Sequence, residues 1–147
     1  MHHMDEGQIL VVSGGDDGSL AFLLANSSTT DAGMETSYAY PPIIVTRTHA
    51  SAVTACAILT SCSRIFILTS GNDEWVRLWE IIPHLSTTAM DPSNPLEIKR
   101  LQKIKTNVAD VSSMAVFRET DDGKASRVLL CGVGMEVIRV EWEQDGI

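Results

Sequence analysis

Residues Thr48–Glu80 decide the fold, and they read THASAVTACAILTSCSRIFILTSGNDEWVRLWE. Two apolar, β-branched runs occur at 52–59 and 65–70, and runs of this length and composition are typical of strands. The turn sequence GNDE follows at 71–74, and apolar and polar residues then alternate from 75 to 81. The stretch therefore predicts three antiparallel strands joined by short turns.

The rest of the chain repeats this pattern in both directions. The Asp-Gly pairs at 17–18 and 122–123 suit hairpin turns, because Asp-Gly readily adopts positive φ angles. No long segment has apolar residues at helical spacing. We therefore expect an all-β chain with about nine or ten strands. The further strands are expected at 9–13, 19–24, 43–48, 98–105, 111–117, 127–131 and 136–142.

The composition is that of a folded, acidic protein. The 147 residues are 44% apolar and carry a formal net charge of −8, which is typical of a globular domain and not of a disordered chain. A domain that holds nucleic acid through electrostatics alone should be basic, so protein partners are favoured over bare DNA or RNA. The apolar runs, such as 65–68, are far shorter than the ~20 residues that a membrane helix needs.

The three cysteines, Cys56, Cys62 and Cys131, form no CxxC pair. Zinc requires closely spaced ligands, and an odd number of cysteines argues against a disulfide framework. We expect free, reduced thiols and no metal or other cofactor. Reduced cysteines fit a cytoplasmic location.

Three hairpins can be aligned on their turns. In SGGDDGSL (13–20) and in TSGNDEWV (69–76), an Asp follows a hydroxyl residue by four positions. The third hairpin, CGVGMEV (131–137), keeps the small-residue turn but has no Asp. In the middle unit His49 lies 30 residues before Trp79. The spacing indicates a structural repeat whose middle copy is the most complete.

This middle unit resembles the WD repeat, in which a Gly-His pair and a Trp-Asp pair bracket a blade of four strands over ~40–45 residues. Thr48 here replaces the Gly, and Glu80 replaces the Asp. In the WD-repeat family a His, a strand hydroxyl, a turn Asp and a Trp form a hydrogen-bonded network that locks the blade. The resemblance implies the same structural network from His49, Thr69, Asp73 and Trp79.

The network has a physical reason, and it also has a rival interpretation. A carboxylate in a packed turn must be paired, and an imidazole N–H is a suitable donor, while a Thr hydroxyl satisfies the other ring nitrogen. The rival is a hydrolase triad of His49, Asp73 and a Ser or Thr. Because no nucleophile-elbow motif is present and Asp73 sits in a hairpin turn, we expect a structural network and no enzyme activity.

The resemblance implies an all-β fold that is a partial WD-repeat β-propeller, with about two and a half blades of four-stranded antiparallel sheet. Complete propellers have roughly four to eight blades, so the rest of the propeller is expected from a missing N-terminal chain. Along the sequence we expect a start or tag remnant at 1–6, a partial blade at 7–25, a loop at 26–41, a WD-repeat blade at 42–81, a second loop at 82–96 and a C-terminal blade at 97–143.

Two motifs near the C-terminus carry a more specific resemblance. NVADVSSM at 107–114 and LCGVGMEV at 130–137 resemble the last blade of the WD repeat-containing protein 6 family, and residues 13–24 and 49–54 are similar to the same family. The chain would then be a C-terminal part of such a protein. Asp110 stands near the position of a blade His, so we expect the network of the last blade to be degenerate or absent.

This resemblance implies a non-catalytic, cytoplasmic scaffold. Its partner would be the methyltransferase that places a 2′-O-methyl group on the ribose of the tRNA wobble nucleotide, and the scaffold would hold tRNA against that enzyme. The methyl donor and the catalytic residues would belong to the partner, and the chain has no glycine-rich donor-binding loop. The alternative is a generic WD-repeat protein-interaction adaptor in signalling or trafficking.

The densest basic run has two open interpretations. Its cations would contact tRNA phosphates or a partner, or they would mark an exposed edge strand on which charge prevents unwanted pairing. Trp75 is similarly open between base stacking, a rim contact and packing. The residues of the run are Lys99, Arg100, Lys103 and Lys105.

Overall fold

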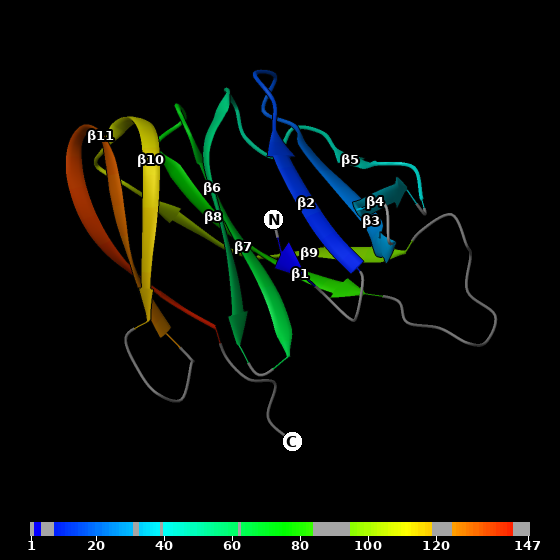
Figure 1. Ribbon diagram of the computed structural model, residues 1–147. Coiled ribbons are helices and arrows are strands. Elements are labelled where there is room, and N and C mark those ends of the chain that lie inside the picture. Colours follow the sequence, from blue (N-terminus) through cyan, green and yellow to red (C-terminus); the bar gives the residue numbers. More distant parts are fainter. Residues whose placement is uncertain are drawn as a thin grey trace.

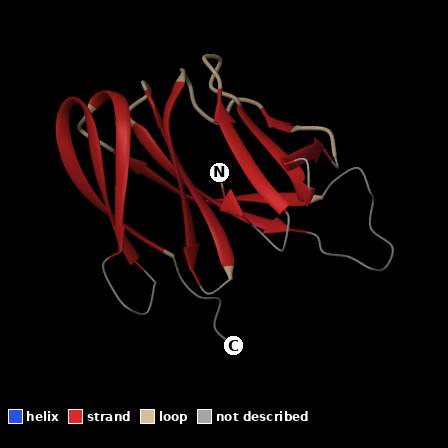
Figure 2. Cartoon of the chain, viewed as in Figure 1, coloured by secondary structure: helices blue, strands red, loops and turns tan. Residues whose placement is uncertain are grey.

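All regular secondary structure in the described part of the chain is β-strand (Figure 2). The all-β prediction is therefore confirmed. The computed structural model describes residues 2–3, 8–30, 33–38, 40–61, 63–83, 95–118 and 125–142 (Figure 1).

Three antiparallel sheets contain these strands, and we call them the first, middle and terminal sheets. The first sheet has the order β1-β2-β3-β4, and β5 also pairs with β3. Its strands are β1 (His2–His3), β2 (Gln8–Gly14), β3 (Leu20–Thr30), β4 (Gly33–Tyr38) and β5 (Ile43–Val45).

The middle sheet follows sequence order, β6-β7-β8-β9, so each strand pairs with the next along the chain. Such a meander needs only short turns, as the sequence of β7 and β8 predicted. Its strands are β6 (Val53–Ser61), β7 (Arg64–Gly71), β8 (Trp75–Pro83) and β9 (Leu96–Lys105).

The terminal sheet consists of β10 (Ala109–Arg118) and β11 (Ala125–Glu141). Pairing between them ends at Ala109 and Val133, and the next residue, Gly134, has a positive φ of 106°. Figure 1 shows that β11 bends over beyond this point and returns beside its own first half. The bend replaces the separate strands expected at 127–131 and 136–142.

Two expected boundaries differ from the structure. The loop expected over 26–41 is wrong for most of its length, because Ala25–Thr30 pairs with Gly33–Tyr38 as a polar hairpin. Polarity alone had suggested a loop, although Thr is common in strands. The segment grouped with the C-terminal unit at 97–143 also divides, since β9 pairs with β8 and belongs to the middle sheet.

The sheets pack face to face, with the middle sheet between the other two (Figure 1). Successive side chains of a strand point to opposite faces, so Ile65 and Ile67 face the first sheet while Phe66 and Leu68 face the terminal sheet. All four are buried. The middle sheet is thus covered on both faces, which explains its long apolar runs.

Candidate functional site

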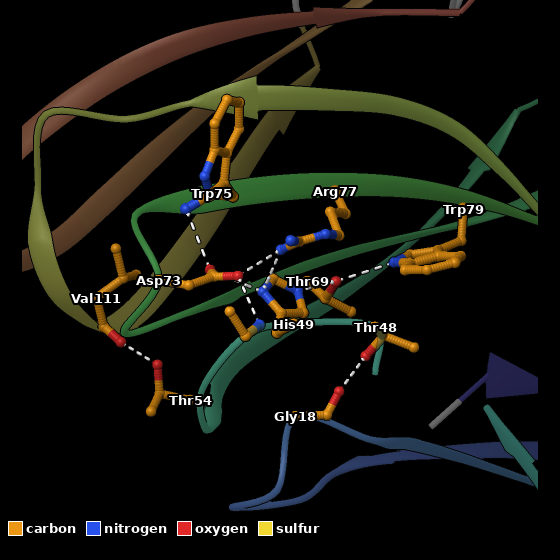
Figure 3. A network of polar contacts seen from close by, with 11 residues as sticks. Gly18, Thr48, His49, Thr54, Thr69, Asp73, Trp75, Arg77, Trp79 and Val111 are labelled. Atoms are coloured by element: carbon orange, nitrogen blue, oxygen red, sulfur yellow. Dashed lines mark hydrogen bonds and ion pairs between the residues drawn. The ribbon is translucent and has the colours of Figure 1, made fainter. Parts of the chain in front are cut away.

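A polar network occupies one end of the middle sheet (Figure 3). His49 comes from the segment between β5 and β6, Thr69 from β7, Asp73 from the turn between β7 and β8, and Trp79 from β8. The antiparallel register of β7 and β8 pairs Thr69 with Arg77, and this places the turn carboxylate above the two strands. The structure therefore brings together the four residues that the repeat spacing singled out.

The hydrogen bonds from Trp79 through Thr69 and His49 to Asp73 can be assigned one direction, with the ring proton on Nδ1, and Arg77, which also lies against Nδ1, does not donate to it in this assignment. Trp79 Nε1 donates to Thr69 Oγ1 at 2.9 Å, since an indole N–H can only donate. The Thr69 hydroxyl lies 2.9 Å from His49 Nε2 and donates its proton to that nitrogen. His49 Nδ1 then carries the ring proton and donates it to Asp73 Oδ1 at 2.9 Å. The imidazole is neutral in this arrangement, with both nitrogens satisfied.

Asp73 accepts further bonds from its surroundings. The backbone N–H of Ala50 donates to Oδ2 at 3.0 Å, and that of Trp75 donates to Oδ1 at 3.3 Å. Arg77 Nη1 donates to Oδ2 at 3.0 Å. Burial works to raise the pKa of Asp73, but the bonds from His49, Ala50 and Arg77 outweigh it and lower that pKa to about 2. The carboxylate is therefore charged at neutral pH.

The pKa of His49 is lowered as well, but by a different cause. Burial lowers the pKa of His49 below its ordinary value, because the charged imidazolium loses its hydration. The hydrogen bond to Asp73 opposes this shift, and the positive charge of Arg77 beside the ring adds to it. The lowered pKa agrees with the neutral ring that the hydrogen-bond directions require.

Arg77 is the member of the network that the sequence did not single out. Its guanidinium is buried and forms a salt bridge to Asp73, four residues earlier in the chain. A signal for it was present, since Trp75, Arg77 and Trp79 alternate onto one face of β8. A cation at the centre of such a face needs a buried partner, and the turn Asp is the nearest candidate.

The network is closed to solvent. Its contacts follow the order hydroxyl, imidazole, carboxylate, as in a hydrolase triad. However, Thr69 is 0% exposed and His49 is 3% exposed. The Thr69 oxygen also accepts the Trp79 N–H. The arrangement fixes the turn and the loop to the strands, and no substrate atom can reach the hydroxyl.

The terminal sheet contains a related cluster that the sequence did not predict. Glu136 accepts the Thr106 hydroxyl at 2.6 Å, the Asn107 backbone N–H at 2.8 Å and the Asn107 side-chain amide at 3.0 Å. These bonds lower the pKa of Glu136. Asn107 and not Asp110 takes part in this cluster, so the expected position was wrong. The cluster contains neither a His nor a Trp, in line with the expectation of a degenerate network.

The two clusters share part of their arrangement. Thr48 and His49 precede β6 as Thr106 and Asn107 precede β10. In both sheets a turn carboxylate accepts a backbone N–H from the loop before the sheet's first strand, at 3.0 Å in the middle sheet and 2.8 Å in the terminal sheet. Two capping clusters of the same design thus occur in successive sheets.

The first hairpin has no comparable cluster among the described residues. Asp17 is exposed, and its carboxylate accepts the Ser19 backbone N–H at 3.0 Å. The carbonyl of Gly18 instead accepts the Thr48 hydroxyl at 2.6 Å and the His49 backbone N–H at 3.0 Å. The turn of the first sheet is thereby joined to the loop that carries His49.

The basic run lies on β9, which is next to the network but not part of it. All four cations are exposed. Lys103 is directly across from Arg77, and its Nζ lies 3.9 Å from the centre of the Trp75 ring. Figure 3 shows that this ring points away from His49 and Asp73. The cations of the run are Lys99, Arg100, Lys103 and Lys105.

The described residues contain no group of three or more His, Cys, Asp or Glu side chains that could hold a metal ion. Cys56 and Cys131 are free thiols, whereas Cys62 falls outside the described residues. No helix in the described ranges has the length and apolar character needed to cross a membrane.

Comparison with known proteins gives no family. No protein-family model matches the chain, and no curated protein matches it in sequence. The findings identify an all-β protein of three antiparallel sheets with a capped middle sheet.

Proposed function

We propose that the chain is a series of WD-repeat blades and serves as a non-catalytic scaffold. The observation that carries this proposal is the repeated capping cluster. Asp73 in the middle sheet and Glu136 in the terminal sheet each tie the turn to the loop before the sheet's first strand. Propellers are built from packed sheets of this kind, in which the same stabilising contacts recur from one repeat to the next.

The packing of the tryptophans supports the same proposal. Trp79 of the middle sheet packs toward the first sheet, and Trp142 of the terminal sheet packs toward the middle sheet. The middle and terminal sheets thus each have a Trp packed toward the sheet that precedes them. Successive sheets related by one repeated contact form an array, and an array of this kind closes into a ring when further sheets are added.

The outer face of the terminal sheet is suited to receive such a sheet. Phe117 is 56% exposed and Met135 is 76% exposed. The pairing places Phe117, Ala115 and Leu129 on this face, whereas Met135 follows the bend at Gly134. Exposed apolar side chains in one region are typical of an interaction surface. The proposed occupant is a further blade of the same propeller.

For the cellular role we propose a scaffold that supports 2′-O-methylation of the ribose of the tRNA wobble nucleotide by a partner methyltransferase in the cytoplasm. This role rests on the resemblance of residues 107–114 and 130–137 to the WD repeat-containing protein 6 family. The buried Thr69 hydroxyl supports a non-catalytic role, because a nucleophile must reach its substrate. Reaction chemistry would then reside in the partner.

A generic protein-interaction adaptor is the second candidate. The net charge of −8 favours it, because an acidic scaffold has little general attraction for RNA. The test is affinity purification of the native protein from cells, followed by mass spectrometry of bound proteins and sequencing of bound RNA. Recovery of a tRNA ribose methyltransferase with tRNA supports the first role. Reproducible recovery of unrelated proteins without tRNA moves the function to the adaptor.

A further inference from the structure

β9 is the outermost strand of the middle sheet, and among the described residues one of its edges is unpaired. The strand spans Leu96–Lys105, which is 10 residues, and pairs with β8 along its whole length. An unpaired edge presents a row of backbone N–H and C=O groups, with which another extended chain can form hydrogen bonds. The unpaired edge of β9 is therefore a site at which another extended chain can bind as an added strand.

The charge of β9 is opposite to that of the whole chain. The protein has a net charge of −8, yet three of its four lysines lie on this strand. The strand also carries Arg100, against the single acidic residue Glu97. A local concentration of positive charge on an acidic protein attracts an acidic partner to this edge and not to the surrounding surface.

A β-bulge aligns three of these cations. Arg100 pairs with Trp79 and Gln102 pairs with Leu78, so Leu101 is an extra residue on β9. Without the bulge, Arg100 would point to the face opposite Lys103 and Lys105, because side chains alternate along a strand. With it, Arg100 joins Lys103 and Lys105 on the face of β8 that carries Trp75, Arg77 and Trp79.

The environment of Trp75 holds two of these cations in place. The ammonium of Lys103 lies 3.9 Å from the ring centre, and that of Lys105 lies 5.5 Å from it. Lys105 also forms a salt bridge to Glu74 at 2.7 Å. A cation that is already ordered loses less conformational entropy when it binds a ligand. Arg100, Lys103 and Lys105 thus form a row of cations, two of them already ordered, that can pair with carboxylates spaced along an added strand.

We propose that β9 binds an extended acidic polypeptide segment as an added strand, with alternate Asp or Glu side chains opposite Arg100, Lys103 and Lys105. A strand rises ~3.3 Å per residue, so alternate carboxylates recur at ~6.6 Å, which is also the interval between Lys103 and Lys105. A nucleic acid has no backbone N–H groups to pair with the edge. Lysines on an edge strand hinder pairing with neutral or basic strands, but an acidic strand can still pair with that edge.

The test uses the 147-residue chain and a labelled peptide of alternating Glu and Thr, matched in length to β9. Binding is measured by fluorescence anisotropy at low ionic strength. A peptide of alternating Glu and Pro has the same charge but lacks every second backbone N–H, and its proline rings obstruct pairing with a strand, and oligouridylate presents phosphates without peptide groups. The proposal predicts saturable binding of the Glu-Thr peptide and at least about tenfold weaker binding of the other two.

Charge reversal locates the site. Lys103→Glu with Lys105→Glu should weaken binding of the Glu-Thr peptide about tenfold or more, and the same variant should gain binding of a Lys-Thr peptide. Arg127→Glu with Arg139→Glu makes an equal change of charge on the terminal sheet and should leave both affinities unchanged. Thermal melting checks that each variant is folded.

Three results would overturn the proposal. One is the absence of Glu-Thr binding, and another is equal binding of the Glu-Pro peptide or of oligouridylate, which would mean unspecific electrostatic attraction. The third is an equal loss of binding in the two reversal variants. The proposal does not depend on the tRNA role, because a failed peptide titration leaves the affinity purification result unaffected.

Discussion

Asp73 places a negative charge at the end of the middle sheet, and the side-chain and backbone donors around it point toward its carboxylate. Those donors are His49, Arg77 and the backbone N–H groups of Ala50 and Trp75. Removing the carboxylate leaves the buried guanidinium and three other donors without their acceptor, a costly situation in a packed site. The stability of this end of the sheet should therefore depend on a single side chain.

We expect Asp73→Ala to lower the free energy of unfolding by about 1–3 kcal/mol. Urea denaturation followed by tryptophan fluorescence measures it. The matched control is Asp17→Ala, because Asp17 holds the corresponding position in the first hairpin but is exposed and bonds only to a nearby backbone N–H. That control should cost no more than about 0.5 kcal/mol. Equal effects of the two substitutions would remove the structural role assigned to the network.

His49 should make stability depend on pH. Its pKa is lowered in the folded protein, so the unfolded chain binds a proton more readily as the pH falls below about 6.5. The contribution of His49 is therefore full above that pH and declines below it. Asp73, with a pKa of about 2 against 3.8 when unperturbed, adds a separate decline between those two values.

The measurement is the free energy of unfolding from pH 5 to pH 8 for the wild type and for His49→Gln, which cannot be protonated. Wild-type stability should fall toward pH 5. The variant should be less stable at pH 8, with a flatter profile below about pH 6.5. Parallel profiles of wild type and variant would show that His49 is not the titrating group.

The sequence predicted the members of the network that have repeat spacing, and it missed residues whose role depends on their three-dimensional surroundings. His49, Thr69 and Asp73 were found because their intervals match a repeat. Arg77 was missed because a cation within a strand ordinarily points to solvent. Glu136 was missed because its turn, counted from Gly132, is two residues longer than the turn from Gly71 to Asp73.

The hairpin of β7 and β8 is the element on which the network is built. Its turn lies close to the chain entering β6, where the Asn72 backbone N–H donates to the Ala52 carbonyl at 3.2 Å. A Cβ placed on Gly71 would lie 2.1 Å from that carbonyl oxygen. The glycine is required here by the close approach of two backbones, and a side chain would push them apart.

Gly71→Ala should therefore destabilise the chain by about 1–3 kcal/mol through overpacking. Gly15→Ala is a suitable control, because a Cβ there would meet the end of the flexible Asp17 side chain at 2.8 Å and no backbone atom closer. Differential scanning calorimetry should show a clearly lower melting temperature for the first variant than for the second. If Gly15→Ala were the more damaging change, the packing of this hairpin would be misassigned.

Among the elements, the buried strands were predictable and the polar hairpin was not. β7 and β8 are covered on both faces, so their apolar runs were evident in the sequence. β3 and β4 continue as a Ser- and Thr-rich hairpin, and β-propensity in such a segment depends on cross-strand partners that a sequence does not reveal. The assignment of β9 to the middle sheet likewise depended on pairing and not on composition.

The whole molecule is held together by cores between sheets. Phe66 is completely buried between the middle and terminal sheets, and its ring centre lies 5.0 Å from that of Trp142. Phe117 lies on the opposite face of the terminal sheet and is 56% exposed. Phe66 therefore lies in a packed interface between sheets, whereas Phe117 lies on a face that the described residues leave uncovered.

Phe66→Ala should lower the free energy of unfolding by about 3–5 kcal/mol, the usual range for a buried aromatic side chain. Phe117→Ala should change it by less than about 0.5 kcal/mol, because little buried surface is lost. Both values come from denaturant titrations of the same chain. A large cost for Phe117→Ala in the isolated chain would mean that its face is already packed.

The central claim is that the three sheets are consecutive blades of a larger array. The all-β nature of the chain followed from the sequence, whereas the assignment of β9 to the middle sheet and the stacking of the sheets required the structure. The most direct measurement is an experimental structure of the protein purified in its native complex. The account predicts another antiparallel sheet packed on β10 and β11, with Phe117 and Met135 buried beneath it. A native complex in which that face remains in solvent, or is covered by helices, would contradict the account.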